Sequence, residues 1–293
     1  MKKSRKGLFI FICILIFLIG VGVLLYPIIY SKYTETIRSD VYTEYMEKVE
    51  DKTDTELEKE FEDAVKFNEL LFNKEIDHLD PENNGYYEQL DLVGNGIMAY
   101  VYVPKIDIKL PIHHGTGVAA LESGCGHMPQ SSLPVGGNNT HSVISAHTGM
   151  SDNPMFSDLE LIEEGDIFQI EVLNRTLTYE VYEINVVSPH DIELIQIQKD
   201  KDLCTLITCT PYGINTHRLL VQGKRIPNPD KEEMALVIEE GNNEDTESVW
   251  LTEYYKSVIR GLIISASILV LIGLVFLVRR ILLKRKRKAH DKK

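Results

Sequence analysis

Two long apolar runs near the ends of the chain constrain its fold more than any other feature. The first, residues 7–30, contains no charged residue, and the second covers 261–278. Each is long enough to cross about 30 Å of hydrocarbon as an α-helix. The sequence therefore predicts membrane segments at 7–30 and 258–278, with the main body of the chain between them.

Basic residues gather at the outer ends of both runs. Of the 31 Lys and Arg residues, 13 lie in 1–6 and 279–293, whereas 31–260 holds 18 basic and 43 acidic residues. Because basic flanks face the cytoplasm, both termini are expected inside the cell and 31–260 outside the cell membrane. A cleaved signal peptide is the alternative for the first run, but the run exceeds the usual apolar length and no small-residue cleavage site follows.

The outer domain is strongly acidic, with a net charge of −25 over 31–260. Such a surface argues against nucleic acid or anionic lipid as its partner. Its cysteines are Cys125, Cys204 and Cys209, an odd number that leaves at least one thiol unpaired. Cys204 and Cys209 are five positions apart in one predicted strand, so they face opposite sides and cannot form a disulfide with each other.

The pattern of the outer domain changes near residue 92. Residues 31–91 hold an amphipathic helical segment, 33–74, and a Pro/Gly/Asn/Asp-rich loop, 77–87. From 92 to 228 the hydrophobic period becomes two, which predicts an all-β domain built as a closed or nearly closed antiparallel barrel. Its predicted strands are 97–103, 106–110, 142–145, 166–172, 176–187, 203–209 and 218–221. The acidic tract 229–257 is predicted to be a linker.

Three chemically capable residues lie at the ends of predicted strands. His147 follows strand 142–145, Cys209 ends strand 203–209, and Arg218 begins the next strand after a short turn. A hairpin can place Cys209 and Arg218 side by side. A thiol attacks as the thiolate, which nearby His and Arg cations favour. From the spacing alone, two other interpretations stay open: that Cys209 is a small core residue, and that Arg218 is a solvated surface residue.

The segments that carry these residues resemble those of the sortases, and within them the class C, pilus-assembling sortases. The resemblance covers roughly 96–226, with Ser-Leu-Pro-Val-Gly-Gly at 132–137, Thr-His-Ser-Val-Ile-Ser-Ala-His at 140–147, Thr-Leu-Ile-Thr-Cys-Thr-Pro-Tyr at 205–212 and Asn-Thr-His-Arg-Leu-Leu-Val at 215–221. It implies a closed eight-stranded β-barrel with short helices, preceded by the amphipathic helical segment and flanked by two transmembrane helices.

The resemblance also implies an activity. Class C sortases are extracytoplasmic cysteine transpeptidases, enzymes of the hydrolase class. They cleave an LPXTG-like sorting signal after Thr and join the acyl group to an amine, either a pilin Lys or a cell-wall precursor. Cys209 would form the acyl-thioester, His147 would donate and accept the proton, and Arg218 would hold the substrate and stabilise the oxyanion. Thr208 would line the substrate site, and no cofactor or metal is implied.

Two positions depart from the class C pattern. A lid loop is expected at Asp80 and Pro81, where the residue that follows is Glu82 rather than the usual aromatic anchor; Tyr86 and Tyr87 lie a few residues further on. The residue after His147 is threonine, where many class C members have Arg, and this is expected to alter the mouth of the site.

No metal site is expected among the histidines at 113, 114 and 127. His113 and His114 are adjacent and face opposite sides of a strand, and with His127 they have no usual metal-ligand spacing. His141, six residues before His147, is expected to be structural.

Two other functions stay open. One is a secreted cysteine peptidase or amidase, although papain-like enzymes place Cys before His in sequence and this chain has the reverse order. The other is a catalytically silent, membrane-anchored scaffold that binds wall or pilin components. The reactivity of the Cys209 thiol separates an enzyme from a scaffold.

Overall fold

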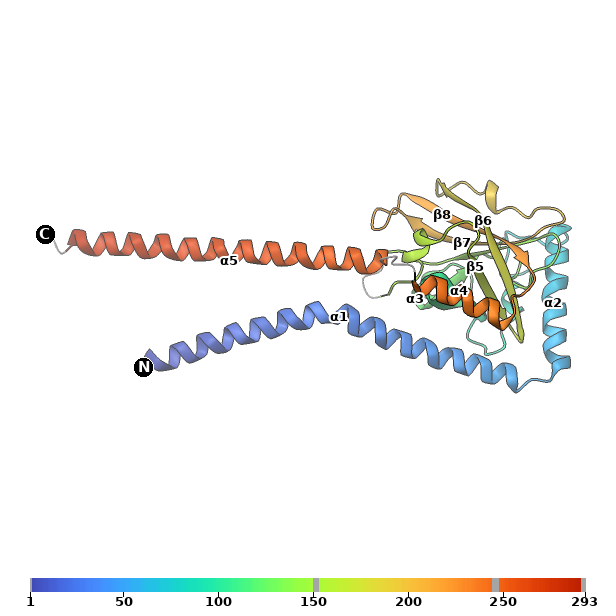
Figure 1. The fold of residues 1–293 in the computed structure, drawn as a ribbon, viewed down its shortest axis with the longest axis horizontal. Helices are drawn as coiled ribbons and strands as arrows, with labels where there is room; N and C mark the ends of the chain where they lie inside the picture. Colours follow the sequence, from blue (N-terminus) through green and yellow to red (C-terminus); the bar gives the residue numbers. More distant parts are fainter. Residues whose placement is uncertain (1, 150–152, 244–247, 291–293) are drawn as a thin grey trace. The chain divides into compact units, whose positions relative to one another are not determined.

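The computed structural model describes residues 2–149, 153–243 and 248–290. The chain divides into two units, Met1–Val249 and Trp250–Lys293. The first contains a β-barrel with two N-terminal helices, and the second consists mainly of helix α5 (Figure 1). Parts of the predicted segments at 1–6, 229–257 and 279–293 lie outside the described residues, namely 1, 244–247 and 291–293.

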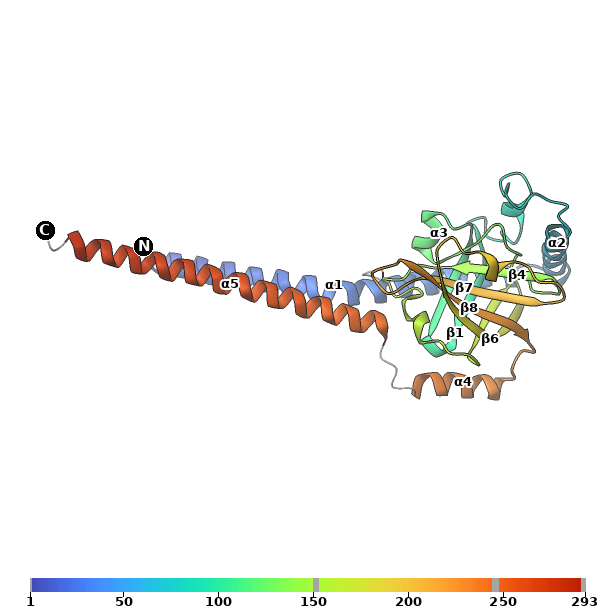
Figure 2. The same cartoon turned by 90° about the horizontal axis from the view of Figure 1, so that it is seen from above.

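Eight strands form a closed barrel in the order β1-β2-β3-β4-β7-β8-β6-β5 (Figure 2). The strands are β1 Ile97–Val103, β2 Ile108–His114, β3 Cys125–His127, β4 Thr140–Ser145, β5 Ile167–Val172, β6 Arg175–Val187, β7 Asp202–Thr210 and β8 His217–Ile226. The prediction of a closed eight-stranded barrel is confirmed.

The expectation that all neighbouring strands are antiparallel is wrong for two pairs. β2 pairs with β3, and β4 with β7, in parallel. Parallel neighbours need a crossover connection, and the segment from β4 through β5 and β6 supplies one before the chain returns as β7. The β4–β7 pairing matters most for function, because it brings the end of β4 beside the end of β7.

The helices differ from the single amphipathic segment predicted at 33–74. Helix α1, Lys2–Glu50, ends just before a short break, and α2, Asp54–Phe72, follows it. At Thr53 a capping box starts α2: the Thr53 hydroxyl accepts from the Glu56 N–H, and the Glu56 carboxylate accepts from the Thr53 N–H. One face of α2 is buried, with Leu57, Phe67 and Leu71 in or against the core.

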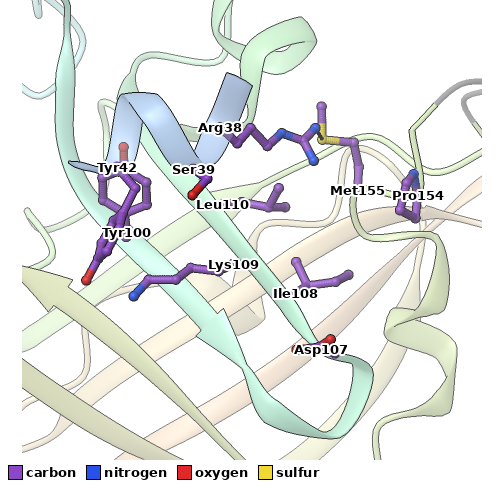
Figure 3. A pocket seen from close by; sticks show the side chains of 10 residues that line it. All are labelled: Arg38, Ser39, Tyr42, Tyr100, Asp107, Ile108, Lys109, Leu110, Pro154 and Met155. Atoms are coloured by element: carbon purple, nitrogen blue, oxygen red, sulfur yellow. Dashed lines mark hydrogen bonds between the residues drawn. The ribbon is translucent and has the colours of Figure 1, made fainter. Parts of the chain in front are cut away.

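Helix α1 packs across the outside of the barrel through aromatic residues. Tyr42 and Tyr45 both contact Tyr100 of β1, with ring centroids 4.9 and 5.3 Å away. Between α1 and the β1–β2 hairpin lies a pocket of about 380 Å³. Figure 3 shows Arg38 reaching from α1 toward Met155 on the pocket wall, where the guanidinium lies 3.3 Å from the sulfur.

The remaining elements are short, apart from α5. They are α3 Val118–Ser123, α4 Lys231–Asn243, α5 Val249–His290, and the 3-10 turns η1 Tyr86–Glu88, η2 Pro104–Ile106, η3 Ser157–Leu161 and η4 Glu193–Ile195. The acidic tract predicted as a linker therefore contains a helix, α4. The two predicted membrane segments fall within α1 and α5, and many of their side chains lie outside the described part of the chain. Among the residues described, none of the helices is both long and apolar enough to span a membrane.

Candidate active site

Cys209 and Arg218 face each other across two neighbouring strands. Cys209 is the last residue but one of β7, and the β7–β8 register places it directly opposite Arg218. Both side chains are partly exposed. The predicted hairpin therefore places Cys209 and Arg218 side by side on paired strands.

His147 reaches the same edge from the other side of β7. The parallel register pairs Ser145 with Ile207, and the Ala146 N–H donates to the Ile207 carbonyl at 3.1 Å. Continued by two residues, this register brings His147 level with Cys209. Cys209 and Arg218 thus lie on the adjacent strands β7 and β8, and His147 follows the end of β4, the other neighbour of β7, at the same end of the barrel.

Thr208 has a different environment from its neighbour. It is buried, and its hydroxyl donates to the Ala146 carbonyl at 2.9 Å. Because side chains alternate along a strand, Thr208 faces the barrel interior while Cys209 faces outward. It ties β7 to the segment that leads into His147, and its predicted contact with substrate stays a prediction.

Hydrogen bonds orient the Arg218 side chain and fix the backbone around His147. The Arg218 guanidinium donates to the His217 carbonyl at 3.0 Å, close to the β7–β8 turn. The His147 carbonyl accepts from the Phe156 N–H at 3.0 Å, and the Gly149 N–H donates to the Ser157 hydroxyl at 3.1 Å. Sequence reasoning missed Ser157, since nothing in the local pattern marks a serine that closes the turn after a histidine.

Apolar side chains continue from the three predicted catalytic residues along the same outer face of their strands. Val143, Ile207 and Leu220 form a small buried cluster separate from the barrel core. They lie two or four positions from the three predicted catalytic residues, so strand alternation places them on the same face. The cluster was not predicted from the sequence, although strand alternation marks it: its members lie two or four positions before or after the three predicted catalytic residues.

A groove of about 510 Å³ lies beside this cluster. Met128 and Ile195 belong to the groove wall and also pack against the cluster. The β6–β7 loop, residues 188–201, and the loop after α2 both contribute lining residues. The main lining residues are Leu79, Met128, Ile192, Ile195, Gln196 and Ile197. An extended peptide with apolar side chains fits a surface of this composition.

The loop predicted to be a lid contributes to the groove through His78 and Leu79 rather than through Asp80. Asp80 is exposed, and its carboxylate accepts from the Asn83 side chain at 2.9 and 3.0 Å. Within the described residues, no hydrogen bond or ion pair joins it to Cys209 or Arg218. A closing contact over Cys209 therefore stays a prediction.

Tyr86 and Tyr87, the aromatic residues nearest to the predicted lid, anchor its C-terminal end instead. The Tyr86 hydroxyl lies 2.9 Å from Nδ1 of buried His127 and accepts from the Gly115 N–H. Tyr87 packs edge-on against Tyr86 and beside His114. These contacts fix the end of the loop to β2 and β3.

The three barrel cysteines differ in access. Cys125 and Cys204 are fully buried, and burial raises the pKa of both thiols. Cys209 is partly exposed, and all three are free thiols. The prediction that Cys204 and Cys209 do not pair is confirmed. In the part of the chain that the structure describes, no group of three or more His, Cys, Asp or Glu residues is placed to hold a metal ion.

Comparison with known proteins gives consistent matches. The sortase domain family model matches residues 101–226. Among curated proteins, the chain is 32% identical to sortase D of Bacillus subtilis over 42% of this chain and 61% of that protein. It is 31% identical to sortase A of Streptococcus agalactiae over 44% of this chain and 52% of that protein. The chain thus spans less than two thirds of the length of these curated relatives.

Solved structures match over more of their own length. Sortase C1 of Streptococcus agalactiae is 40% identical with a TM-score of 0.60, covering 64% of this chain and 98% of that one. Sortase C of Streptococcus pneumoniae is 43% identical with a TM-score of 0.59, covering 64% and 97%. Sortase C of Clostridium perfringens, in a structure with the C-terminal cell wall sorting motif, is 39% identical with a TM-score of 0.57, covering 65% and 100%.

Proposed function

This chain belongs to the sortase family, in its class C, and from that premise we propose that it is a cysteine transpeptidase acting on an LPXTG-like sorting signal. One observation supports the proposal: Cys209 pairs with Arg218 in the β7–β8 register, and β4, which pairs with β7 on its other side, ends two residues before His147. Exposure supports it as well, because Cys209 is the accessible member of the three barrel thiols.

The first half of the reaction forms an acyl-enzyme. The Cys209 thiolate attacks the carbonyl carbon of the signal's Thr, and the carbonyl oxygen becomes an oxyanion beside the Arg218 guanidinium. As the intermediate collapses, the carbon–nitrogen bond breaks and His147 gives its proton to the leaving amine. The products are a Cys209 thioester and the released C-terminal fragment.

The second half transfers the acyl group. An incoming primary amine loses a proton to His147 and attacks the thioester carbon, and the carbon–sulfur bond breaks to regenerate the Cys209 thiolate. We propose a pilin Lys, or a cell-wall precursor amine, as this acceptor. Water competes for the same thioester, so slow hydrolysis is expected when no amine is present.

The apolar surface suits the proposed substrate. The groove beside the buried cluster of Val143, Ile207 and Leu220 can receive the Leu and Pro side chains of the signal, since burial of apolar area supplies most of the binding energy at such sites. The loop that carries Asp80 and Pro81 borders the groove through Leu79, which supports its proposed role as a lid.

The proposed location is the outer face of the cell membrane. The charge-free run 7–30, the apolar run 261–278 and their basic outer flanks support two transmembrane segments with both termini in the cytoplasm. The catalytic barrel would then act on surface or pilin proteins outside the cell.

Cleavage of a quenched LPXTG-type peptide by the full-length chain in detergent, with and without an added amine, tests the proposal. We expect cleavage by the unchanged chain and by Cys125→Ala, which removes a buried thiol elsewhere, and none by Cys209→Ala. An amine adduct in the product establishes transfer. Cleavage without any adduct indicates a peptidase, and no cleavage together with slow alkylation of Cys209 indicates a binding scaffold.

A further inference from the structure

The β6–β7 loop lines the groove, and in the described part of the chain two side chains outside the loop hydrogen-bond to its backbone. Asn139 accepts from the Asp200 N–H at 2.7 Å, near the end of the loop, and His141 bonds to the part that lines the groove. Ile192, Ile195 and Gln196 of this loop line the groove. The Gln196 carbonyl lies 2.9 Å from Nδ1 of His141 on β4. Among the described residues, no other strand side chain hydrogen-bonds to 188–198.

His141 is itself held rigidly. Its side chain is fully buried, and Nε2 lies 2.6 Å from the hydroxyl of Thr205 on β7, which is buried too. Because a carbonyl oxygen only accepts, Nδ1 must carry the proton that bonds to Gln196. Nε2 then accepts from the Thr205 hydroxyl in the neutral ring, and burial lowers the pKa of His141, which favours that neutral form. Both ring nitrogens are therefore used in fixing the loop to the barrel.

The position of His141 rules out a part in the chemical step. It lies six residues before His147 on the same strand face, with Val143 of the apolar cluster between them. Six residues of strand span about 20 Å, so the His141 ring cannot reach the bond that breaks. It stands at the far end of the surface that begins at the catalytic edge.

We infer that His141 is a positioning residue for substrate binding. Its Nδ1–H bond to the Gln196 carbonyl holds the β6–β7 loop in the position that forms the groove. Thr205 fixes the orientation of the ring for that bond. The role in substrate binding rests on the proposed function, whereas the attachment of the loop does not. Loss of the bond lets the loop move away from the apolar cluster, so the signal binds more weakly while the catalytic edge is unchanged.

Two matched variants separate the roles of the two ring nitrogens. The amide of Asn in His141→Asn can place a donor near the Nδ1 position and keep the bond to Gln196. The amide of Gln in His141→Gln reaches the Nε2 position and keeps a contact with Thr205 instead. Thr205→Val removes the hydroxyl at nearly constant volume and tests the support of the ring.

The measurements use the full-length chain in detergent. We expect His141→Gln to raise KM for an LPXTG-type peptide by about 3- to 10-fold, the factor that one ordinary hydrogen bond is worth, with kcat and the rate of Cys209 alkylation little changed. His141→Asn should keep KM close to that of the unchanged chain, and Thr205→Val should shift KM in the same direction as His141→Gln. Amide hydrogen exchange over 188–198 should be faster in His141→Gln than in His141→Asn.

Three results would overturn the inference. One is equal exchange over 188–198 in the Asn and Gln variants. Another is a loss of kcat at constant KM, which would give His141 a part in the chemistry. The third is faster exchange over the whole barrel, which would make it an ordinary core residue. If the unchanged chain cleaves no peptide, the proposed function fails, but the exchange comparison still decides whether His141 holds the loop.

Discussion

The sulfur atoms of Cys125, Cys204 and Cys209 have different surroundings, and the difference makes a direct prediction. Burial raises the pKa of Cys125 and Cys204, so little thiolate forms there, while Cys209 opens to solvent. Iodoacetamide treatment of the folded chain, followed by peptide mass spectrometry, should therefore label Cys209 before the other two. Labelling of Cys204 first would contradict the assigned nucleophile.

Arg218 is predicted to act through the geometry of its guanidinium as well as its charge. The Arg218 side chain is oriented by the His217 carbonyl, a contact that a lysine ammonium on a flexible stem does not reproduce in the same place. Arg218→Lys should lower kcat for peptide cleavage by about 100-fold or more, the usual cost of losing an oxyanion donor. Arg225→Lys, at the other end of the same strand, is the control and should leave kcat within about twofold. A fully active Arg218→Lys would refute the oxyanion role.

His127 makes the stability of the barrel depend on pH. Full burial lowers its pKa to about 4, while in the unfolded chain it titrates near 6.5. Between those values the unfolded state binds one more proton, so the free energy of unfolding falls as the pH drops from about 6.5 to 4, by at most roughly 3 kcal/mol. Urea unfolding should give a lower free energy of unfolding at pH 5 than at pH 7. The difference between the two pH values should be smaller in His127→Gln than in the unchanged chain. An equal loss in both proteins would assign it to other groups.

Among single residues, the sequence predicted that His147, Cys209 and Arg218 lie close together, because each stands at the end of a predicted strand. It could not locate Ser157 or Thr205. Ser157 acts on Gly149 eight residues away, and Thr205 acts on His141 from 64 residues away in the chain. Roles of this kind depend on a residue that is distant in the sequence and close in the fold, so they leave no pattern in the neighbouring sequence.

Among the elements, α2 offers the clearest prediction. Its capping box at Thr53 satisfies two backbone donors at the helix start. Thr53→Ala should lower the free energy of unfolding by about 1 kcal/mol without changing peptide cleavage, as measured by urea unfolding and the peptide assay. Thr43→Ala, which removes an exposed mid-helix hydroxyl bonded to the Ser39 carbonyl, is the matched control and should cost less. A larger loss from the control would contradict the capping argument.

Period-two patterning predicted most strands but not how they pair. Alternating apolar residues look the same in parallel and antiparallel neighbours, so the parallel β4–β7 pair was not foreseeable from the pattern. Strand β3 escaped because it has three residues with a central glycine at position 126. The helix α4 was not predicted because its short apolar run, 234–238, lies between acidic and polar residues that are also typical of a linker.

For the whole molecule, the segments before the barrel are part of its core. Four of their large side chains are buried, namely Tyr45, Leu57, Phe67 and Tyr86. The Asn68 side chain also donates to the carbonyl of Leu133 and accepts from its N–H. A chain that begins at residue 92 loses all of them, at roughly 2 kcal/mol for each buried side chain. We expect its melting temperature to be at least about 10 °C below that of a chain beginning at residue 34. Scanning fluorimetry would reveal this, and equal melting temperatures would mean that the barrel folds without its N-terminal helices.

The parallel pairing of β4 with β7 also determines how late in synthesis the proposed active site can be completed. Ala146 and Thr208, which meet beside the catalytic edge, are separated by 62 positions in the chain. Arg218 follows later still, on the strand that lies between β7 and β6 in the closed barrel. During synthesis from the N-terminus, the histidine therefore exists long before its thiol and guanidinium partners. A chain interrupted before β8 holds His147 and Cys209 but not Arg218, so the proposed site is complete only when the last strand closes the barrel.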